Sequence, residues 1–368
     1  MKIDRRLIVN FDWPLLFLVL GMCAAGLLNI YSAGYSLRYL PQEPYYIKQL
    51  KWVALGIVFM FFTFSIDYRT ISRYAYLIYA VSILLLISVL VFGKTAQGAQ
   101  RWIVLGGFTF QPSELIKLSL ILVLARFFEE RGLDGPYRLR DLLIPFILLA
   151  TPFTLILKQP DLGTALMLFF IFTAIVFFIG IYWKSLILAS AGLLLATPLC
   201  WYLLKDYQKE RLLTFLSPER DPLGSGYHTI QSIIAVGSGG MTGKGFLEGT
   251  QTQLKFLPEQ QTDFVFSALA EEWGFIGAMA VLSMFFMLIS LGLRISAGSR
   301  DLNGAVISFG VTAFIALAVF VNIGMVLGIL PVVGVPLPFL SYGGSSTVVL
   351  MMGIGLLMNV SVRRFVFQ

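Results

Sequence analysis

The sequence is poor in charged residues, which make up 13% of its 368 positions, while hydrophobic residues make up 58%. A soluble domain usually carries about 25% charged residues, because its surface must meet water. The mean hydropathy of +0.83 is correspondingly high. This composition excludes an ordinary soluble domain and indicates that lipid is the solvent of most of the chain.

Histidine and cysteine are also scarce, with one and two residues. His228 alone cannot supply a metal cage built from several histidines. Cys23 and Cys200 each lie inside an apolar run, which predicts buried thiols rather than a disulfide or a metal site. The net charge of +7 comes from short basic clusters between apolar runs. Such clusters are typical of membrane orientation signals and not of a nucleic-acid-binding face.

Long apolar runs are the main feature of the sequence. A straight span needs about 20 residues, so the shorter runs must extend into flanking polar residues. The first run lacks a cleavage pattern at its end and is interpreted as a retained signal anchor. We predict one all-α membrane domain over residues 1–368, without repeats and with about ten spans. The runs fall at about 14–34, 52–66, 74–92, 113–128, 142–157, 162–183, 186–204, 264–293, 303–330 and 345–361.

The distribution of Lys and Arg predicts the orientation of these spans. With the N-terminus inside, the inner segments hold 14 of these 27 residues and the short outer loops hold 6. This excess places both termini in the cytoplasm and the polar segment 205–262 outside. A loop of this length in a compact protein is usually functional. Within it, Tyr227–Val236 is apolar enough to form a short interfacial helix.

Glu114 and Lys117 are the first candidate site residues, because ionisable groups at membrane depth are costly. Pro112 suits the first turn of a helix, on which Glu114 and Lys117 share a face at i, i+3. One interpretation is an ion pair that neutralises itself and lets the helix enter lipid. The other is a pair that borders a polar cavity open to the outer face. The two interpretations are compatible.

Asp161 lies in a polar turn, Lys158–Thr164, that joins two apolar runs at the outer face. Aspartate is favoured as the cap of a following helix, which is one interpretation. The alternative is that Asp161 binds a cation or a substrate group beside Glu114.

Asp263 stands at the outer mouth of the long run 264–293. Thr262 or Asp263 could act as the N-cap of that helix. A carboxylate held in a partly apolar setting could instead serve as a general base. Glu271 and Glu272 follow two turns later, inside the span, where burial again makes charge expensive.

Two further motifs match known active sites incompletely. The segment Gly237–Gly245 resembles a phosphate loop, but Ser238 stands where the first glycine is needed and Gly245 where Ser or Thr should bind magnesium. We interpret its glycines as a tight turn close to the membrane. Ser341 has no histidine partner in any visible pattern, which argues against a hydrolase triad. The small residues around it predict close packing or the approach of backbone to a ligand.

Five separated motifs resemble the shape, elongation, division and sporulation (SEDS) family. They occur in the family's order, and the resemblance runs from about residue 10 to residue 362. The segments Gly249–Leu257 and Gly328–Pro336 are more similar to the cell-elongation members than to the division members. Gln261 is a departure, because relatives often carry His there. The motifs are Gln111–Glu114, Gln159–Thr164, Leu257–Phe264, Glu271–Glu272 and Pro338–Ser345.

The resemblance implies a peptidoglycan glycosyltransferase of the bacterial inner membrane. Such an enzyme polymerises lipid II into glycan strands during cell elongation, beside a class B penicillin-binding protein that cross-links them. Residue by residue, the essential aspartate of the family falls on Asp263. The family's ion pair at the membrane edge falls on Glu114 and Lys117, and a further functional acid falls on Asp161.

The implied chemistry is compatible with these residue types. A β1,4 link formed from an α-linked diphosphate donor inverts the anomeric carbon, so one base and one in-line attack are enough. A glycosidase needs a second carboxylic acid, because its leaving group is poor. We expect Asp263 to take the proton from the 4-hydroxyl of the acceptor sugar.

The leaving lipid diphosphate needs positive charge on its oxygens. Arg101, Lys117 or Arg211 is expected to supply it. The alternative is a divalent cation, magnesium or manganese, held by acids such as Asp263 and Asp161. No other cofactor is expected.

Two other functions fit part of the pattern. A flippase or transporter of a lipid-linked cell-wall precursor would also place ionisable groups at membrane depth. A scaffold that recruits the cross-linking enzyme would not need the carboxylate of Asp263. Polymerisation of lipid II by the purified protein distinguishes the enzyme from both alternatives.

Overall fold

The computed structural model describes residues 11–35, 43–96, 99–105, 108–132, 135–203, 209–210, 213–215, 225–257 and 259–366, which are mostly helical. The long helices are α2 (Trp13–Ala33), α3 (Tyr45–Ser65), α5 (Ala75–Phe92), α6 (Pro112–Arg131), α7 (Leu143–Lys158), α8 (Leu162–Ile179), α9 (Trp183–Leu203), α13 (Val265–Ala297), α14 (Leu302–Val326) and α15 (Gly344–Val366). The shorter helices are α4 (Tyr68–Arg73), α11 (Ser225–Ser238) and α12 (Thr250–Gln253).

Each apolar run predicted from the sequence coincides with one of the long helices. Seven of these helices are long and apolar enough to cross a membrane, so the chain is a multi-pass membrane protein. The expected extension into polar residues is clearest in α3, which begins at Tyr45 rather than at residue 52. The short helix predicted at Tyr227–Val236 is confirmed as α11, and its interfacial position stays a prediction.

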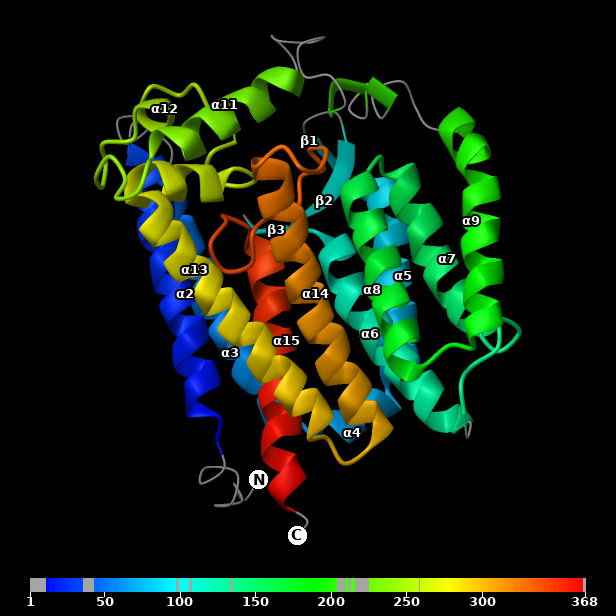
Figure 1. Cartoon of the computed structure of the whole chain (residues 1–368). Helices are drawn as coiled ribbons and strands as arrows, with labels where there is room; N and C mark the ends of the chain where they lie inside the picture. Colours follow the sequence, from blue (N-terminus) through cyan, green and yellow to red (C-terminus); the bar gives the residue numbers. More distant parts are fainter. Residues whose placement is uncertain are drawn as a thin grey trace.

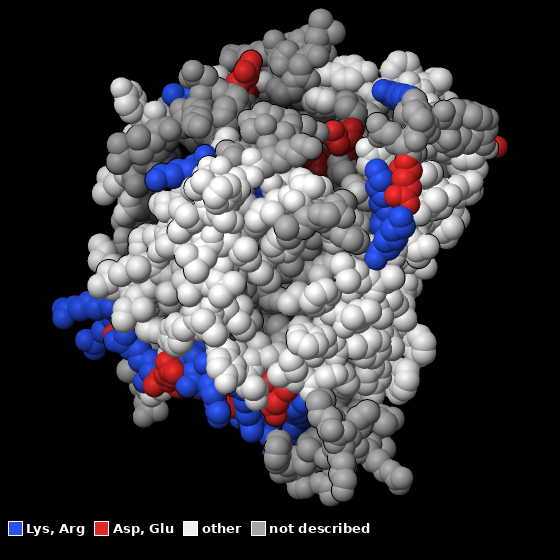
Figure 2. Space-filling view, turned by 180° about the vertical axis from the view of Figure 1, so that it is seen from behind, with Lys and Arg blue, Asp and Glu red and all other residues white. Residues whose placement is uncertain are grey.

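The long helices run alongside one another in a single bundle (Figure 1). Helices α11 and α12 lie at one end of it, and the start of α2 and the end of α15 lie at the other. On the face shown in Figure 2, charged side chains gather near the two ends and leave a band between them almost free of charge. This distribution is the one expected for a protein whose middle faces hydrocarbon.

Helix α15 forms the centre of the bundle. Its most apolar window is 89% buried within the protein, against 28% for α3 and for α5. Small residues let α15 approach α3 closely: a Cβ atom on Gly355 would overlap the carbonyl oxygen of Met60, and one on Gly56 would press on Met351. Small residues at such contacts allow helix backbones to pack tightly in a membrane.

The prediction of an all-α fold is wrong between α5 and α6. A three-stranded antiparallel sheet forms there from β1 (Lys94–Ala96), β2 (Ala99–Leu105) and β3 (Phe108–Phe110). The segment is rich in aromatic, β-branched and glycine residues, a pattern that favours strands joined by tight turns. The strands are only three to seven residues long and lie between two apolar runs, so they could not be separated from those runs in the sequence.

Strand β2 contains an irregularity at Arg101. The pairing passes from Thr95 opposite Gln100 to Lys94 opposite Trp102, which leaves Arg101 as an extra residue without a partner on β1. Such a bulge redirects a side chain from the regular alternation of a strand. Arg101 is therefore free to reach the turn before α8.

Helix α13 is interrupted at Gly274, whose φ of 64° and ψ of −162° are not helical. This backbone conformation is essentially restricted to glycine. Gly243 approaches the interruption so closely that a Cβ atom on either glycine would overlap the backbone of the other segment. The sequence predicted one continuous run here, because a single glycine inside an apolar helix gives a weak signal.

Four backbone hydrogen bonds join the glycine-rich segment 239–245 to the two sides of this interruption. They supply partners for carbonyl and N–H groups that the break in the helix leaves unpaired. The bonds run from Lys244 N to Glu271 O at 3.0 Å, from Gly245 N to Glu272 O at 3.1 Å, from Phe275 N to Gly240 O at 2.9 Å and from Ile276 N to Met241 O at 3.1 Å. The segment that partly resembles a phosphate loop therefore binds, through its backbone, the residues on both sides of the interruption in α13.

We predict that Gly274→Ala lowers the thermal stability of the purified protein. The substitution adds a Cβ atom against Gly243 and forces a strained backbone conformation that costs about 1–3 kcal/mol. Thermal unfolding in detergent measures the change. Gly237→Ala is the matched control, because no atom lies within 4 Å of a Cβ at that helical position. Equal midpoints for the two variants would contradict the role given to Gly274.

Candidate active site

Asp263 lies in a turn immediately before α13. The N–H groups of Thr262, Asp263 and Phe264 converge on the carbonyl of Glu259 at 3.1, 3.2 and 3.3 Å. The N-cap of α13 is Phe264, whose side chain makes no capping hydrogen bond. The alternative that Thr262 or Asp263 serves as the helix cap is therefore wrong.

Three successive carbonyl groups of this turn accept hydrogen bonds from the end of α14 and from the loop 327–343 that follows it. Asn322 Nδ2 donates to Asp263 O at 2.9 Å, Ser341 Oγ to Thr262 O at 2.5 Å and Tyr342 N to Gln261 O at 2.8 Å. The backbone on the N-terminal side of α13 is thus fixed to a second segment of the chain.

The carboxylate of Asp263 lies against the same loop. Gly334 has a φ of 70°, and a Cβ atom there would lie 3.4 Å from Asp263 Oδ2. The loop also touches the start of α8, since a Cβ atom on Gly163 would overlap the carbonyl oxygen of Val333. Val333 and Gly334 therefore separate Asp263 from the first turn of α8. The structure brings Asp263 and Asp161 to the two sides of one loop.

Asp161 is the N-cap of α8, so the capping interpretation is confirmed. Its carboxylate accepts from the N–H and the hydroxyl of Thr164 at 3.2 and 3.0 Å. It also forms an ion pair with Arg101 at 3.7 Å and accepts from the side-chain amide of Gln111 at 3.4 Å. A charged residue of the sheet and a polar residue at the start of α6 thus meet at this helix end.

Arg101 is held mainly by backbone carbonyl groups. Its guanidinium donates to the carbonyl of Gln159 at 3.2 Å and to that of Pro160. Gln111 connects the cluster to α15, because its N–H donates to the hydroxyl of Ser345 at 2.9 Å. Arg101 therefore has partners in the protein before any substrate arrives.

Glu114 and Lys117 form the predicted ion pair, at 2.7 Å. The two residues are 4% and 3% exposed, and Lys117 Nζ lies 4.8 Å from the ring centroid of Phe314. Their enclosure between α6 and α14 agrees with the interpretation of a self-neutralising pair. The second oxygen of Glu114 has no hydrogen-bond partner among the described residues. Its predicted role in the site stays a prediction.

Glu271 is fully buried in the N-terminal part of α13 and has several partners. It forms an ion pair with Lys244 at 2.7 Å and accepts from the N–H groups of Gln251 and Thr252 at 2.9 and 3.1 Å. Glu272 accepts from the hydroxyl of Ser32. These contacts join the segment 244–252 to α13, and α13 to α2. Lys244 could not be recognised from the sequence as a partner of Glu271, because the two residues are 27 positions apart.

Gln261 and Tyr342 complete the surroundings of the turn. A Cβ atom on Gly34 would lie 3.1 Å from Gln261 Nε2, so this side chain packs against the end of α2. Tyr342 stacks edge-on against Tyr45, with ring centroids 5.0 Å apart. Burial, with smaller contributions from Tyr45 and Glu43, raises the pKa of Tyr342. Tyr342 therefore stays neutral at physiological pH and is excluded as a general base.

The roles of two contributors to this site were not predicted from the sequence. Asn322 is a lone amide in the apolar run 303–330. Ser341 was noted within a motif and weighed as a nucleophile, but its contact with the Asp263 turn was not predicted. A polar residue inside a membrane span marks a specific interaction, so Asn322 carried a usable signal. Arg211 lies outside the described residues.

A metal ion would need ligands from a substrate at this site. Within the described part of the chain, no group of three or more His, Cys, Asp or Glu is placed to hold a metal. Magnesium is often held by one or two carboxylates together with substrate phosphate oxygens. Asp263 or Asp161 could supply one carboxylate in that mode, with a diphosphate supplying further ligands, whereas the loop at Val333 and Gly334 lies between the two carboxylates.

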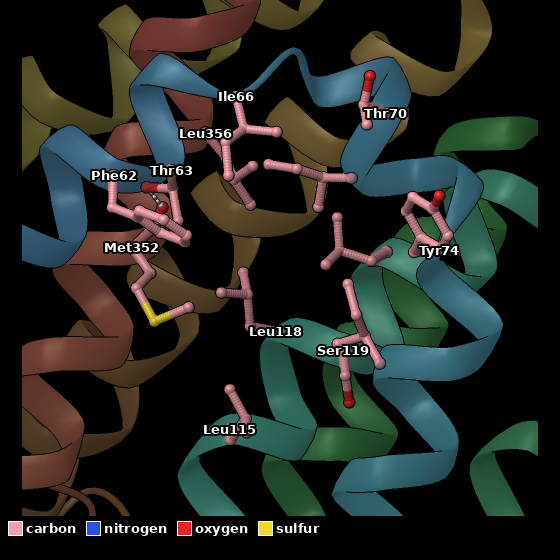
Figure 3. Close-up of a pocket in the computed structure, with 13 residues that line it drawn as sticks. Phe62, Thr63, Ile66, Thr70, Tyr74, Leu115, Leu118, Ser119, Met352 and Leu356 are labelled. Carbon is pink, nitrogen blue, oxygen red and sulfur yellow. Dashed lines mark hydrogen bonds between the residues drawn. The ribbon is translucent and has the colours of Figure 1, made fainter.

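An apolar cavity of about 360 Å³ lies at the other end of the bundle, near α4. Figure 3 shows Leu115 and Leu118 of α6 beside it, together with Met352 and Leu356 of α15. None of the predicted site residues lines this cavity. Helix α6 thus presents one face to the cavity, while Lys117 lies against α14.

Comparison with known proteins agrees with the motifs. Residues 13–365 match the FtsW/RodA/SpoVE family model, which is described as a cell cycle protein. The peptidoglycan glycosyltransferase MrdB of Escherichia coli (strain K12) is 41% identical, over 97% of this chain and 95% of MrdB. The peptidoglycan glycosyltransferase RodA of Treponema pallidum (strain Nichols) is 34% identical, over 98% of this chain and 99% of that protein.

Solved structures show the same fold. The rod shape determining protein RodA of Thermus thermophilus aligns with a TM-score of 0.71 at 31% identity, covering 96% of this chain and 98% of that chain. A structure described as the coordination of polymerization and crosslinking by a peptidoglycan synthase complex contains a chain with a TM-score of 0.82 at 35% identity, over 96% of this chain and 98% of that one. The resemblance found in the motifs is confirmed, and the chain belongs to the FtsW/RodA/SpoVE family, which is the SEDS family.

Proposed function

We propose that this protein is a peptidoglycan glycosyltransferase that polymerises lipid II into glycan strands during cell elongation. The observation that carries the proposal is the fixed turn that holds Asp263 beside the loop 327–343 and the first turn of α8. Relatives at 41% and 34% identity are named peptidoglycan glycosyltransferases. The proposed compartment is the bacterial inner membrane.

The proposed topology has ten spans, both termini in the cytoplasm and the segment 205–262 outside. It is supported by the excess of Lys and Arg in the inner segments and by the position of α11 and α12 opposite the start of α2 and the end of α15 (Figure 1). In this orientation Asp263 and Asp161 lie near the outer face, where lipid II is polymerised.

In the proposed mechanism, Asp263 removes the proton from the 4-hydroxyl of the acceptor sugar as that oxygen attacks the anomeric carbon of the donor. The β1,4 bond forms, and the bond from carbon to the lipid diphosphate breaks with inversion. General-base catalysis of this kind contributes about 10²–10⁴-fold. Positioning of the two lipid-linked substrates supplies much of the remaining rate enhancement.

A divalent cation, magnesium or manganese, is the proposed source of positive charge on the leaving diphosphate. Two of the basic candidates already have partners: Lys117 is buried with Glu114, and Arg101 bonds the turn before α8. Asp263 or Asp161 would hold the cation together with oxygens of the diphosphate, and the cation would stabilise the developing negative charge. Arg101 is 31% exposed at its side chain and keeps a supporting role.

The proposed partner is a class B penicillin-binding protein within the elongation machinery. The side of α13 that is not covered by other helices is suited to such a contact, because Phe275, Ile276 and Phe286 are 56%, 60% and 74% exposed. Exposed apolar side chains also face lipid in any membrane protein. The main support for the partner is therefore that a similar chain, at 35% identity, occurs in a structure described as a peptidoglycan synthase complex.

Asp263→Asn is expected to abolish polymerisation, lowering it by about 10²–10⁴-fold, because an amide cannot accept the proton. The measurement is glycan synthesis from lipid II by the purified protein, alone and with its cross-linking partner. Asp141→Asn is the control, since Asp141 pairs with Arg131 at the opposite end of the bundle.

Three outcomes would oppose this proposal. A wild type that moves lipid II but forms no polymer would favour a flippase. Normal growth and shape in cells that carry only Asp263→Asn would favour a scaffold. Equal polymer from the wild type and Asp263→Asn would exclude Asp263 as the base.

Removal of divalent cations is expected to stop polymerisation, and addition of magnesium or manganese is expected to restore it. The physical reason is that the diphosphate needs a counter-charge that the paired basic residues do not offer. The assay compares the purified protein with and without a chelator at constant ionic strength. Full activity in the chelator would contradict the cation proposal. A basic side chain would then neutralise the leaving diphosphate, and Arg211 would be the first residue to substitute.

Glu114→Gln is expected to reduce the yield of folded protein, because it leaves Lys117 buried without a counter-charge, at a cost of about 3–5 kcal/mol. The double variant Glu114→Gln with Lys117→Met removes both charges and should recover the yield. If the pair supports the site, turnover per folded molecule stays low in the double variant. Turnover equal to the wild type would make the pair purely structural.

A further inference from the structure

The turn that carries Asp263 is held by an unusual set of donors. Its three successive carbonyl groups, from Gln261 to Asp263, accept from three donors within residues 322–342. Two of these donors are side chains, Asn322 and Ser341. Side-chain donors can be removed by substitution without breaking the backbone, so their contribution can be tested separately.

Asn322 is fully buried near the outer end of the apolar helix α14. Its single amide group bridges two carbonyl groups, donating to Asp263 O at 2.9 Å and to Val335 O at 2.8 Å. Val335 is the neighbour of Gly334, against which the Asp263 carboxylate lies. The amide therefore fixes the backbone of Asp263 relative to the loop that its carboxylate touches.

Helix stability does not explain the presence of this amide. The second polar atom, Asn322 Oδ1, is buried and has no hydrogen-bond partner among the described residues. A buried polar atom without a partner is costly, and an apolar residue of similar size would avoid that cost. The benefit of Asn322 must therefore lie in the two carbonyl groups that it joins.

Ser341 makes a second bridge of the same kind. Its hydroxyl accepts from Leu337 N at 2.8 Å and donates to Thr262 O at 2.5 Å. Gln49 of α3 anchors the residues that follow: its amide donates to Thr347 Oγ1 at 2.9 Å, and its oxygen accepts from Gly343 N at 3.2 Å. The loop is thus tied to a neighbouring helix as well as to the Asp263 turn.

We propose that Asn322 and Ser341 are positioning residues that set the location of the Asp263 carboxylate. The inference rests on the proposed role of Asp263 as the base. Neither side chain needs to touch substrate, because each acts on the backbone next to the carboxylate. A displacement of about 1 Å of a reacting group can cost about 100-fold in rate.

The experiment compares Asn322→Ala and Ser341→Ala with a matched control, Asn359→Ala. Asn359 is equally buried and also donates to several carbonyl groups, those of Thr63 and Phe64 at 2.8 and 3.1 Å. It lies near the end of α15, where its side chain contacts Tyr68 of α4. This end of the bundle is opposite α11 and α12 (Figure 1). Thermal stability, kcat and KM for lipid II are measured for each purified variant.

Asn359→Ala should lose more thermal stability than Asn322→Ala, because Asn359 Oδ1 also accepts from Tyr68 N at 3.1 Å, whereas Asn322 Oδ1 has no partner among the described residues. In the folded fraction, Asn322→Ala and Ser341→Ala should lower kcat by about 10–100-fold with KM changed little, because the base is misplaced and the substrate surfaces are intact. Asn359→Ala should retain kcat. Ser341→Thr keeps the hydroxyl and should recover most of the kcat that Ser341→Ala loses.

Two outcomes separate this inference from the proposed function. If Asp263→Asn abolishes polymerisation while both alanine variants keep the wild-type kcat, the positioning inference fails and the enzyme assignment stands. If Asp263→Asn leaves polymerisation intact, the base assignment fails first. A drop in kcat for Asn359→Ala equal to that for Asn322→Ala would also overturn the inference, because loss of any buried amide would then suffice.

Discussion

A backbone N–H or C=O group in the apolar part of a membrane has no water to bond, and each unpaired group costs several kcal/mol. The non-helical parts of this structure depend on that constraint. At the interruption of α13, the glycine-rich segment supplies the missing partners. At the Asp263 turn, the end of α14 and the loop after it supply them. Irregular backbone is retained where other parts of the protein complete its hydrogen bonds.

The same constraint explains why the site lies where helices end. A carboxylate buried among apolar helices needs a counter-charge, as Glu114 in the first turn of α6 does with Lys117. Asp263 and Asp161 lie instead in turns before helices, where backbone groups and neighbouring loops surround them. The turn that carries Asp263 is fixed by hydrogen bonds from other segments of the chain. Hydrogen bonds at the helix ends thus fix the position of the Asp263 turn, as the packed core fixes an active site in a soluble enzyme.

The helices were predictable from the sequence, since runs of apolar residues in lipid have little alternative to a helix. Asp263, Asp161, Glu114 and Lys117 were also identifiable, because ionisable residues at membrane depth are rare. The sheet between α5 and α6 and the break at Gly274 were not, because both depend on a few residues within longer apolar stretches.

The partners of the site were the hardest part to foresee. Lys244 pairs with Glu271 because the segment 239–245 binds the interruption in α13. Asn322 donates to the carbonyl of Asp263, which is 59 positions away in the sequence. No local period brings such residues together. The resemblance to a family selected the candidate carboxylates, whereas the structure identified what holds them.

The bulge in β2 has a consequence for how this chain can vary. Arg101 reaches the turn before α8 because one extra residue interrupts the pairing with β1. Deleting a single neighbouring residue would restore regular pairing and turn that side chain to the opposite side of the strand. The contact with Asp161 would be lost although both residues were retained. The number of residues in this hairpin is therefore under constraint as well as their identity, and insertions or deletions there are less tolerable than substitutions.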